Sequence, residues 1–228
     1  MATLDEALEK LRQNARPDQL AGMARFGITV EKRQGVSIPA LRKIAKELGP
    51  DHRLAGKLWR TGSGEARILA SMIADPAELS EKQMEQWAGD FDSWDVCDQV
   101  CQNLFEKSPL AWKKIGEWAG REREYVRRAA FALIACLAWH DRKAGDERFL
   151  ALLPLIEAAC TDERNYVRKA VNWALRNIGK RNRALNRAAI CTAKDIRRLD
   201  CRAARWIAAD AQRELESEAV QRRLKRSP

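Results

Sequence analysis

The chain has 228 residues, of which 46% are hydrophobic and 32% charged, a composition that excludes a disordered protein and predicts a soluble globular one. Its longest apolar stretch, at 129–139, is well short of the roughly 20 residues that a membrane span needs. The formal net charge is +10, and residues 164–228 carry 18 Lys and Arg against 6 Asp and Glu. Such an asymmetry favours a polyanionic partner, above all nucleic acid, over a surface that is merely well solvated.

The predicted elements are all helices, because apolar residues recur at i, i+3, i+4 and i+7 almost throughout. The acidic start of the chain resembles neither a signal nor a transit peptide, so we expect a cytoplasmic protein. Ser37 and Ser108 precede prolines that suit a first helical turn, and Pro154 should kink or break the helix that contains it. The predicted helices are 3–14, 17–26, 38–48, 51–60, 64–74, 80–88, 93–106, 109–119, 122–139, 147–160, 163–179 and 193–215.

A repeat of about 40 residues is visible in the second half of the chain. Tyr125-Val126-Arg127-Arg128-Ala129-Ala130 recurs 41 residues later as Tyr166-Val167-Arg168-Lys169-Ala170-Val171. Cys201-Arg202-Ala203-Ala204 is a weaker copy, and Glu65-Ala66-Arg67 begins an earlier one. This period, with two helices in each unit, is typical of HEAT-like repeats. We therefore predict an all-α fold, an α-solenoid of HEAT-like two-helix repeats that forms one domain over residues 1–228.

The repeat also predicts a basic concave face. Arginines and lysines recur near the start of one helix in each copy, and stacked copies would line them up along a curved surface. Such a surface could follow the backbone of duplex DNA without reading its sequence. The alternative, left open here, is that these cations pair with acids of the next repeat.

The usual catalytic and metal-binding sets are missing from the sequence. His52 and His140 are not accompanied by the residues that would complete a metal site or a catalytic triad, and no glycine-rich phosphate loop occurs. Six cysteines lie at helical positions with no Cys-x-x-Cys pair, which favours buried free thiols. We expect neither a metal nor a cofactor.

One helix start stands out, Ser93-Trp94-Asp95-Val96-Cys97-Asp98. Its spacing puts the indole of Trp94 and the carboxylate of Asp98 on one helix face. An acid on the inner face of a basic groove is unexpected for a simple DNA binder, because it repels phosphate. The other tryptophans are most simply core residues: Trp59, Trp87, Trp112, Trp118, Trp139 and Trp206.

Several segments resemble the AlkD-type DNA alkylation repair proteins, in the same order along the chain. They are Gly22 to Phe26, Ser93 to Asp98, Tyr125 to Leu133 and Lys169 to Arg176, and together they extend over most of residues 20–180. The resemblance implies a HEAT-like solenoid that removes N3- or N7-alkylated purines from DNA by cleaving the N-glycosidic bond.

By the same resemblance, Asp98 would be the catalytic carboxylate, flanked by Trp94 and Trp173, with Arg128 beside the DNA backbone. Phe26 stands where family members can carry a tyrosine, and Ser93 stands where they can carry another tryptophan. The residues that we expect to contact DNA are Arg25, Phe26, Arg127, Arg168, Lys169, Arg176, Lys180, Arg202 and Arg205. The expected partner is alkylated double-stranded DNA, bound by a monomer without a membrane or a nucleotide cofactor.

Two other functions remain open at this stage. The same scaffold could bind damaged or branched DNA without cleaving it, or it could join other proteins, as solenoids often do.

Overall fold

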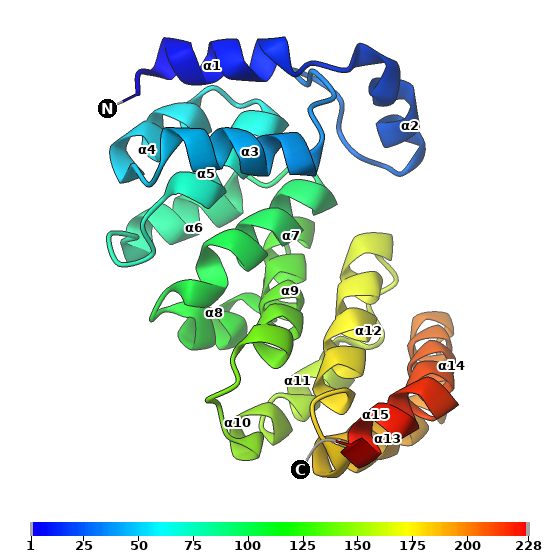
Figure 1. Cartoon of the computed structure of the whole chain (residues 1–228). Helices are drawn as coiled ribbons and strands as arrows, with labels where there is room; N and C mark the ends of the chain where they lie inside the picture. Colours follow the sequence, from blue (N-terminus) through cyan, green and yellow to red (C-terminus); the bar gives the residue numbers. More distant parts are fainter. Residues whose placement is uncertain (1, 227–228) are drawn as a thin grey trace. The chain divides into compact units, whose positions relative to one another are not determined.

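The computed structural model of the protein describes residues 2–226, and no strand occurs among them. Contacts between residues group the chain into two compact units, Met1–Ala111 and Trp112–Pro228, here called unit 1 and unit 2. Figure 1 labels the helices of both. No helix in the described part of the chain has both the length and the apolar character needed to cross a membrane. A single domain over the whole chain stays a prediction.

Unit 1 is built around α5, which is buried along almost its whole length and contacts α1, α3, α4 and α7. Small and branched apolar side chains, such as Ala66, Leu69 and Ala70, let these helices approach closely. The elements of unit 1 are α1 (Leu4–Gln13), the 3-10 helix η1 (Pro17–Gln19), α2 (Leu20–Arg25), α3 (Ile38–Leu48), α4 (His52–Arg60), α5 (Gly64–Ile73), α6 (Glu81–Gly89), α7 (Trp94–Asn103) and the 3-10 helix η2 (Phe105–Lys107).

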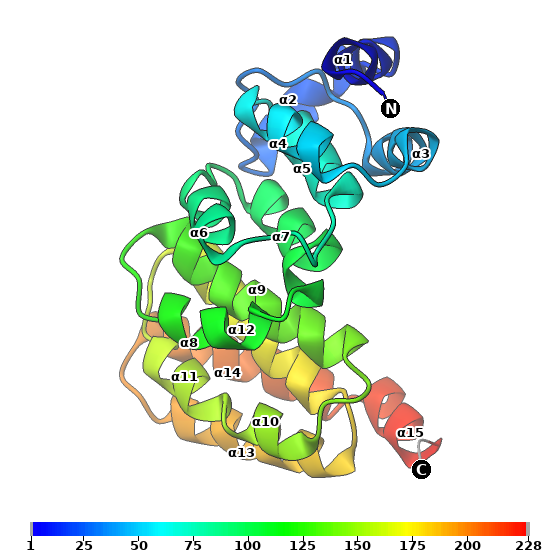
Figure 2. The same cartoon turned by 90° about the vertical axis from the view of Figure 1, so that its left-hand side faces the viewer.

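Unit 2 consists of two layers of helices. The long helices α9, α12 and α14 pack side by side in chain order, and α13 packs against α10, α11, α12 and α14. Figure 2 shows α13 running across unit 2 beside α10 and α11. The elements are α8 (Ala111–Trp118), α9 (Glu124–His140), α10 (Asp146–Leu150), α11 (Leu153–Ala159), α12 (Asn165–Gly179), α13 (Arg183–Arg197), α14 (Arg202–Leu215) and α15 (Glu218–Arg226).

The predicted repeat is confirmed in unit 2. Tyr125 near the start of α9 and Tyr166 near the start of α12 hold equivalent positions, and their rings stack at 5.8 Å between centroids. Several local signals are confirmed as well. The Ser37 hydroxyl accepts the Ala40 N–H at the start of α3, and the helix predicted at 147–160 is broken into α10 and α11, with Pro154 in the first turn of α11.

The helix predicted at 193–215 is wrong. The chain forms α13 and α14 there, separated by residues 198–201, and α13 begins ten residues earlier than predicted. Asn182 accepts the Leu185 N–H at 2.9 Å and so starts α13 only three residues after α12 ends. The carboxylate that caps α14 comes from another repeat, since Glu163 accepts the Ala203 N–H at 3.1 Å. Helix α15 was not predicted at all.

The expectation for the cysteines is correct in part. All six are free thiols; Cys97, Cys101, Cys136 and Cys160 are buried, whereas Cys191 is exposed and Cys201 is partly exposed. Two of the predicted core tryptophans are exposed instead, Trp139 by 49% and Trp206 by 38%.

Candidate functional site

Helix α7 carries the predicted Trp94 and Asp98 at its first turns. Both side chains are half-buried, and their spacing of four residues places them on one face of the helix. The indole N–H of Trp94 donates a hydrogen bond of 3.0 Å to the carbonyl oxygen of Phe26, at the end of α2. The indole is therefore held by a segment 68 residues away in the sequence.

The segment after α2 is anchored to the start of α7 by a network of polar contacts. The hydroxyl of Ser93 accepts the Thr29 N–H at 3.3 Å and donates to the Asp95 carboxylate at 2.6 Å. Arg33 donates to the same carboxylate at 2.8 Å and to the Thr29 carbonyl oxygen at 2.8 Å. The Ser93, Arg33 and Asp95 side chains are all largely shielded from solvent. Ser93 and Asp95 thus bind within the fold and position the start of α7.

A buried carboxylate holds the other end of this segment. Glu65, at the start of α5, accepts the N–H groups of Gln34 at 3.1 Å and Gly35 at 2.9 Å, and the Ser63 hydroxyl at 3.2 Å. Gly35 has a φ of 77°, and a Cβ there would lie 2.0 Å from the carbonyl oxygen of Arg16. Only glycine fits at this point, because both the backbone conformation and the space exclude a side chain.

The other acids near α7 have partners in unit 1. Asp90 accepts the indole N–H of Trp59 at 2.8 Å, and Arg67 reaches Asp92 at 3.3 Å. The Trp59 ring stacks on Trp87 with 4.0 Å between centroids. These two tryptophans are buried, as predicted.

Phe26 and Arg25, which we predicted to contact DNA, are both exposed at the end of α2. The Phe26 side chain is 76% exposed although its carbonyl oxygen holds Trp94. An exposed aromatic ring next to a cation is suited to stacking on a base while the cation contacts a phosphate.

The remaining two predicted catalytic residues belong to unit 2. Arg128, on α9, is buried and donates a hydrogen bond of 2.5 Å to the carbonyl oxygen of Tyr166 in the next repeat. Trp173, on α12, is half-buried. The structure thus places Trp94 and Asp98 together in unit 1, and Arg128 and Trp173 in unit 2.

Several of the predicted DNA-contacting cations form ion pairs between repeats. Arg127 of α9 lies 3.1 Å from Asp162, which also binds Arg164. Burial alone would raise the pKa of Asp162, but the hydrogen bonds and charges of these arginines lower it overall. These contacts tie the start of α9 to the segment before α12.

A second ion-paired group joins α12 to α14. Arg176 pairs with both Asp210 and Glu214, and Lys180 lies 2.8 Å from Glu214. Burial raises the pKa of Glu214, but Lys180 and Arg176 outweigh it and leave the pKa below its ordinary value.

The other predicted cations of unit 2 are more accessible. The Arg168 guanidinium lies 4.8 Å from the ring centroid of Trp206, a cation–π contact between α12 and α14. Lys169 and Arg202 are exposed and form no ion pair with any residue from 2 to 226, and Arg205 pairs with the exposed Asp200 at 2.7 Å.

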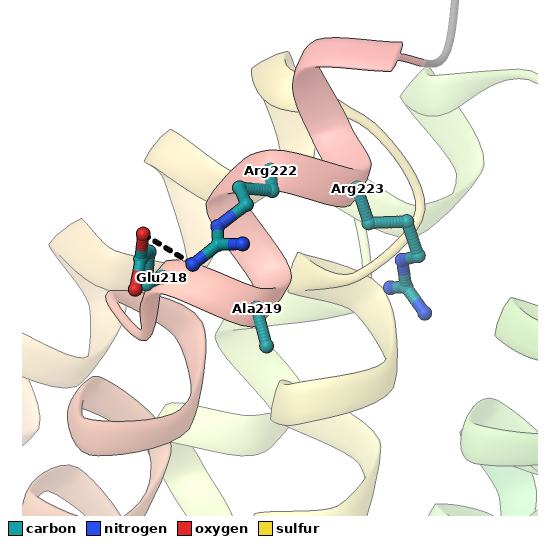
Figure 3. A pocket seen from close by; sticks show the side chains of 4 residues that line it. All are labelled: Glu218, Ala219, Arg222 and Arg223. Carbon is teal, nitrogen blue, oxygen red and sulfur yellow. Dashed lines mark ion pairs between the residues drawn. The ribbon is translucent and has the colours of Figure 1, made fainter.

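The described part of the chain has no cluster suited to a metal ion. Among residues 2–226, no three or more His, Cys, Asp or Glu side chains gather where they could hold one. A shallow hollow of about 400 Å³ lies against α15, lined by Glu218, Ala219, Arg222 and Arg223 (Figure 3). Its Arg222 is paired with Glu218, and it contains none of the predicted site residues.

The sequence matches one protein family over almost its whole length. A sequence profile described as the DNA alkylation repair enzyme family covers residues 7–214. The chain belongs to this family. The family membership agrees with the resemblance carried by the Trp94–Asp98 and repeat motifs.

The fold of this DNA alkylation repair family member is that of HEAT-like repeat proteins. One solved structure matches with a TM-score of 0.81 at 20% sequence identity. The match covers 98% of this chain and 96% of the other chain. It is described as one of a new family of proteins related to the HEAT-like repeat DNA glycosylases with affinity for branched DNA structures. A designed armadillo repeat protein bound to a (KR)4 peptide matches at 16% identity with a TM-score of 0.37, too low to indicate a shared fold. No curated protein sequence matches the chain.

Sequence reasoning about this family member missed the residues that position the site. Arg33, Glu65 and Ser93 act through contacts with residues 30 or more positions away. From the local sequence alone, an acid in the first turn of a helix, such as Glu65, is interpreted as a residue that stabilises the helix dipole. Only the tertiary fold shows that its carboxylate binds the N–H groups of a distant loop.

Proposed function

We propose that the protein is a DNA glycosylase that removes cationic N3- or N7-alkylated purines by hydrolysis of the N-glycosidic bond. One observation carries the proposal. A carboxylate, Asp98, and an indole, Trp94, share a helix face in a member of the DNA alkylation repair enzyme family, and the indole is fixed by the Phe26 carbonyl. The polar network around Ser93 and Asp95 holds the helix start that carries both groups.

The chemistry needs few groups because an alkylated purine is already a cation. When the bond between the sugar carbon and the purine nitrogen breaks, its electron pair moves to the base, which leaves as a neutral molecule. The base needs no proton from a general acid, and this suits a site without histidine. Positive charge builds instead on the sugar.

Asp98 is proposed to stabilise that charge. A fixed carboxylate near the sugar carbon offsets the developing oxocarbenium ion and can orient the water that attacks it. As the water adds, it gives up one proton, which the carboxylate can accept and pass to solvent. Asp98 would thus serve as electrostatic stabiliser and as base.

The aromatic residues are proposed to favour cationic lesions over ordinary bases. The faces of indole rings attract cations by roughly 0.5–2 kcal/mol, so Trp94, and Trp173 by the family resemblance, would bind a methylated purine better than a neutral one. Phe26 would stack on a neighbouring base. Arg128 is proposed to position the DNA backbone, although its hydrogen bond to the Tyr166 carbonyl lies within the protein.

The decisive experiment is incubation with duplex DNA that contains N7-methylguanine, followed by measurement of the free base released in a single turnover. We expect release by the wild type and a loss of about 10²–10³ in rate for Asp98→Asn, the usual cost of removing an electrostatic stabiliser. Binding of the duplex should stay unchanged or tighten slightly, because a negative charge near phosphates is removed. If the variant releases base as fast as the wild type, Asp98 takes no part in the reaction.

A second function is favoured by the solved structure that shares this fold. Its protein family has affinity for branched DNA structures. The chain could therefore bind branched or damaged DNA without chemistry. Wild-type protein that releases no base, yet binds a four-way junction more tightly than a duplex of equal length, would establish this alternative.

A further inference from the structure

Helix α13 carries exposed cations on one face, in its first two turns and again in its last turn. Its exposed basic residues follow the helical period, so they fall within an arc of about 100° around the helix axis. From first to last they extend over about 22 Å at 1.5 Å per residue. They are Arg183, Arg187, Lys194, Arg197 and Arg198, here called the α13 cationic face.

These cations differ from most of the others in unit 2, because almost none of them forms an ion pair with an acid of the protein. Arg198 alone has an acidic partner, the exposed Asp195 at 3.1 Å, and Arg197 donates to the Gln212 amide at 3.2 Å. Arg183, Arg187 and Lys194 form no ion pair with any described residue. By contrast, Arg127, Arg164, Arg176 and Lys180 all neutralise acids at the junctions between repeats.

The α13 cationic face points away from the layer that holds the predicted DNA contacts of unit 2. The opposite side of α13, with Leu185, Ala189 and Ile196, is buried, and the helix packs against α12 and α14. The cations predicted from the repeat motif lie on α9, α12 and α14. Unit 2 therefore has two separate cationic surfaces, one on each layer.

We propose that the α13 cationic face is a second binding surface for the phosphate backbone of DNA. The proposal rests on the DNA-binding function argued above and adds that one protein molecule can hold two DNA segments at once. Five exposed cations over about 22 Å match a polyanion whose charges repeat every 3.4 Å along each strand. Four of the five are arginines, whose planar forks suit phosphate oxygens.

The composition of this face favours DNA over a membrane surface. Helices that lie on anionic membranes combine cations with large apolar residues that enter the lipid. Between Arg183 and Arg198 no Trp, Phe or Leu is exposed, and Ile190 on the same side is only partly exposed. The exposed Leu199 follows beyond the end of the helix. A contact made of charge alone is typical of backbone binding without sequence preference.

The test compares two variants that each remove three positive charges. The first carries Arg183→Gln, Arg187→Gln and Lys194→Gln, which keep good helix formers on an exposed surface. The matched control carries Arg42→Gln, Lys43→Gln and Lys46→Gln, exposed cations of α3 in unit 1. Two duplexes with different fluorophores report bridging by energy transfer at low salt. Anisotropy with one duplex, in protein excess, reports binding at the first surface.

We expect the wild type and the α3 control to bridge the two duplexes. The α13 variant should lose bridging at least about tenfold, and the salt slope for the second duplex should fall by about 2–3, close to 0.9 for each phosphate that is no longer neutralised. Its single-duplex affinity and its rate of base release should stay within about twofold of wild type.

Five outcomes would overturn the inference. Single-duplex binding by wild type without bridging, or bridging that survives in the α13 variant, removes the second surface but leaves the proposed function intact. Equal loss of single-duplex affinity and bridging would make α13 part of the first surface. Binding of phosphatidylcholine–phosphatidylserine vesicles (about 3:1) that depends on α13, without bridging, would assign the face to membranes. If wild type binds no duplex at all, the proposed function fails together with this inference.

Discussion

Four carboxylates lie within nine residues around the start of α7, and their surroundings assign them different roles. Asp90 binds the Trp59 indole, Asp92 pairs with Arg67, and Asp95 is enclosed by Arg33 and Ser93. Asp98 lies one turn further, on the face of Trp94. The spacing of Trp94 and Asp98 could be read from the sequence. The roles of the other acids could not, because their partners lie far away in the chain.

The contrast between Asp95 and Asp98 is testable on purified variants. Asp95→Asn leaves the Arg33 guanidinium, which is almost fully buried, without its counter-charge, so we expect a loss of stability of about 3 kcal/mol. Urea unfolding monitored by circular dichroism measures it. Asp98→Asn should reduce the rate of base release by far more than any loss of folded protein accounts for. Equal losses of stability in the two variants would show that Asp98 is also a structural acid.

Glu65 gives a second prediction at this scale. Replacement by Ala removes the acceptor of two backbone N–H groups and a hydroxyl, so Glu65→Ala should cost about 2–4 kcal/mol. Because Glu65 holds the segment whose Phe26 carbonyl binds Trp94, base release should fall as well. Glu65→Gln, which keeps one oxygen acceptor, should recover part of both losses. Hydrogen exchange of the Gln34 and Gly35 amides gives a direct readout, and exchange as slow as in wild type would contradict this role.

At the scale of elements, the sequence predicts helices well where their ends have local signals. Ser37 and Pro154 mark the starts of α3 and α11 within a few residues, and both signals act within the first turn of their own helix. The start of α14 has no such signal: Cys201 makes no side-chain cap, and the Ala203 N–H is bound by Glu163, about 40 residues earlier. A boundary set by another repeat cannot be seen in a short stretch of sequence. This is why α13 and α14 were predicted as one helix.

The junctions between repeats predict how stability depends on pH. The folded protein lowers the pKa of Asp162 and Glu214, so their ion pairs stabilise the fold above the ordinary carboxyl pKa and lose this contribution as the pH falls through the folded values. We expect the urea midpoint to drop on acidification below about pH 4. Asp162→Asn should lower the midpoint at neutral pH and show a smaller acid-induced drop. If wild type and variant lose stability in parallel down to about pH 3, Asp162 does not contribute to the acid response.

At the scale of the whole chain, charge is distributed unevenly. Residues 1–163 hold 24 basic and 26 acidic residues, whereas residues 164–228 hold 18 and 6. Some of the 18 cations are neutralised by acids of the same segment, as Arg176 is by Glu214. The excess of positive charge can be counted from the sequence. Which of the cations are neutralised by ion pairs cannot, because that depends on contacts between repeats. Lys169, Arg202 and the α13 cationic face remain exposed for a polyanion.

This distribution leads to the last prediction, a steep dependence of DNA binding on salt. Each phosphate that a cation neutralises releases condensed counterions, so the logarithm of affinity falls by about 0.9 for each contact per decade of salt. With about six contacts, affinity for an undamaged duplex should fall by about 10³ between roughly 50 and 200 mM salt. Anisotropy titrations at several salt concentrations measure the slope. Lys169→Gln with Arg202→Gln, both exposed and without ion pairs, should reduce it by about 2. Arg176→Gln should leave the slope nearly unchanged and lower stability instead, because its charge is already neutralised by Glu214. A slope near zero for the wild type would mean that the basic end of the chain does not bind DNA, and that its charge serves another partner.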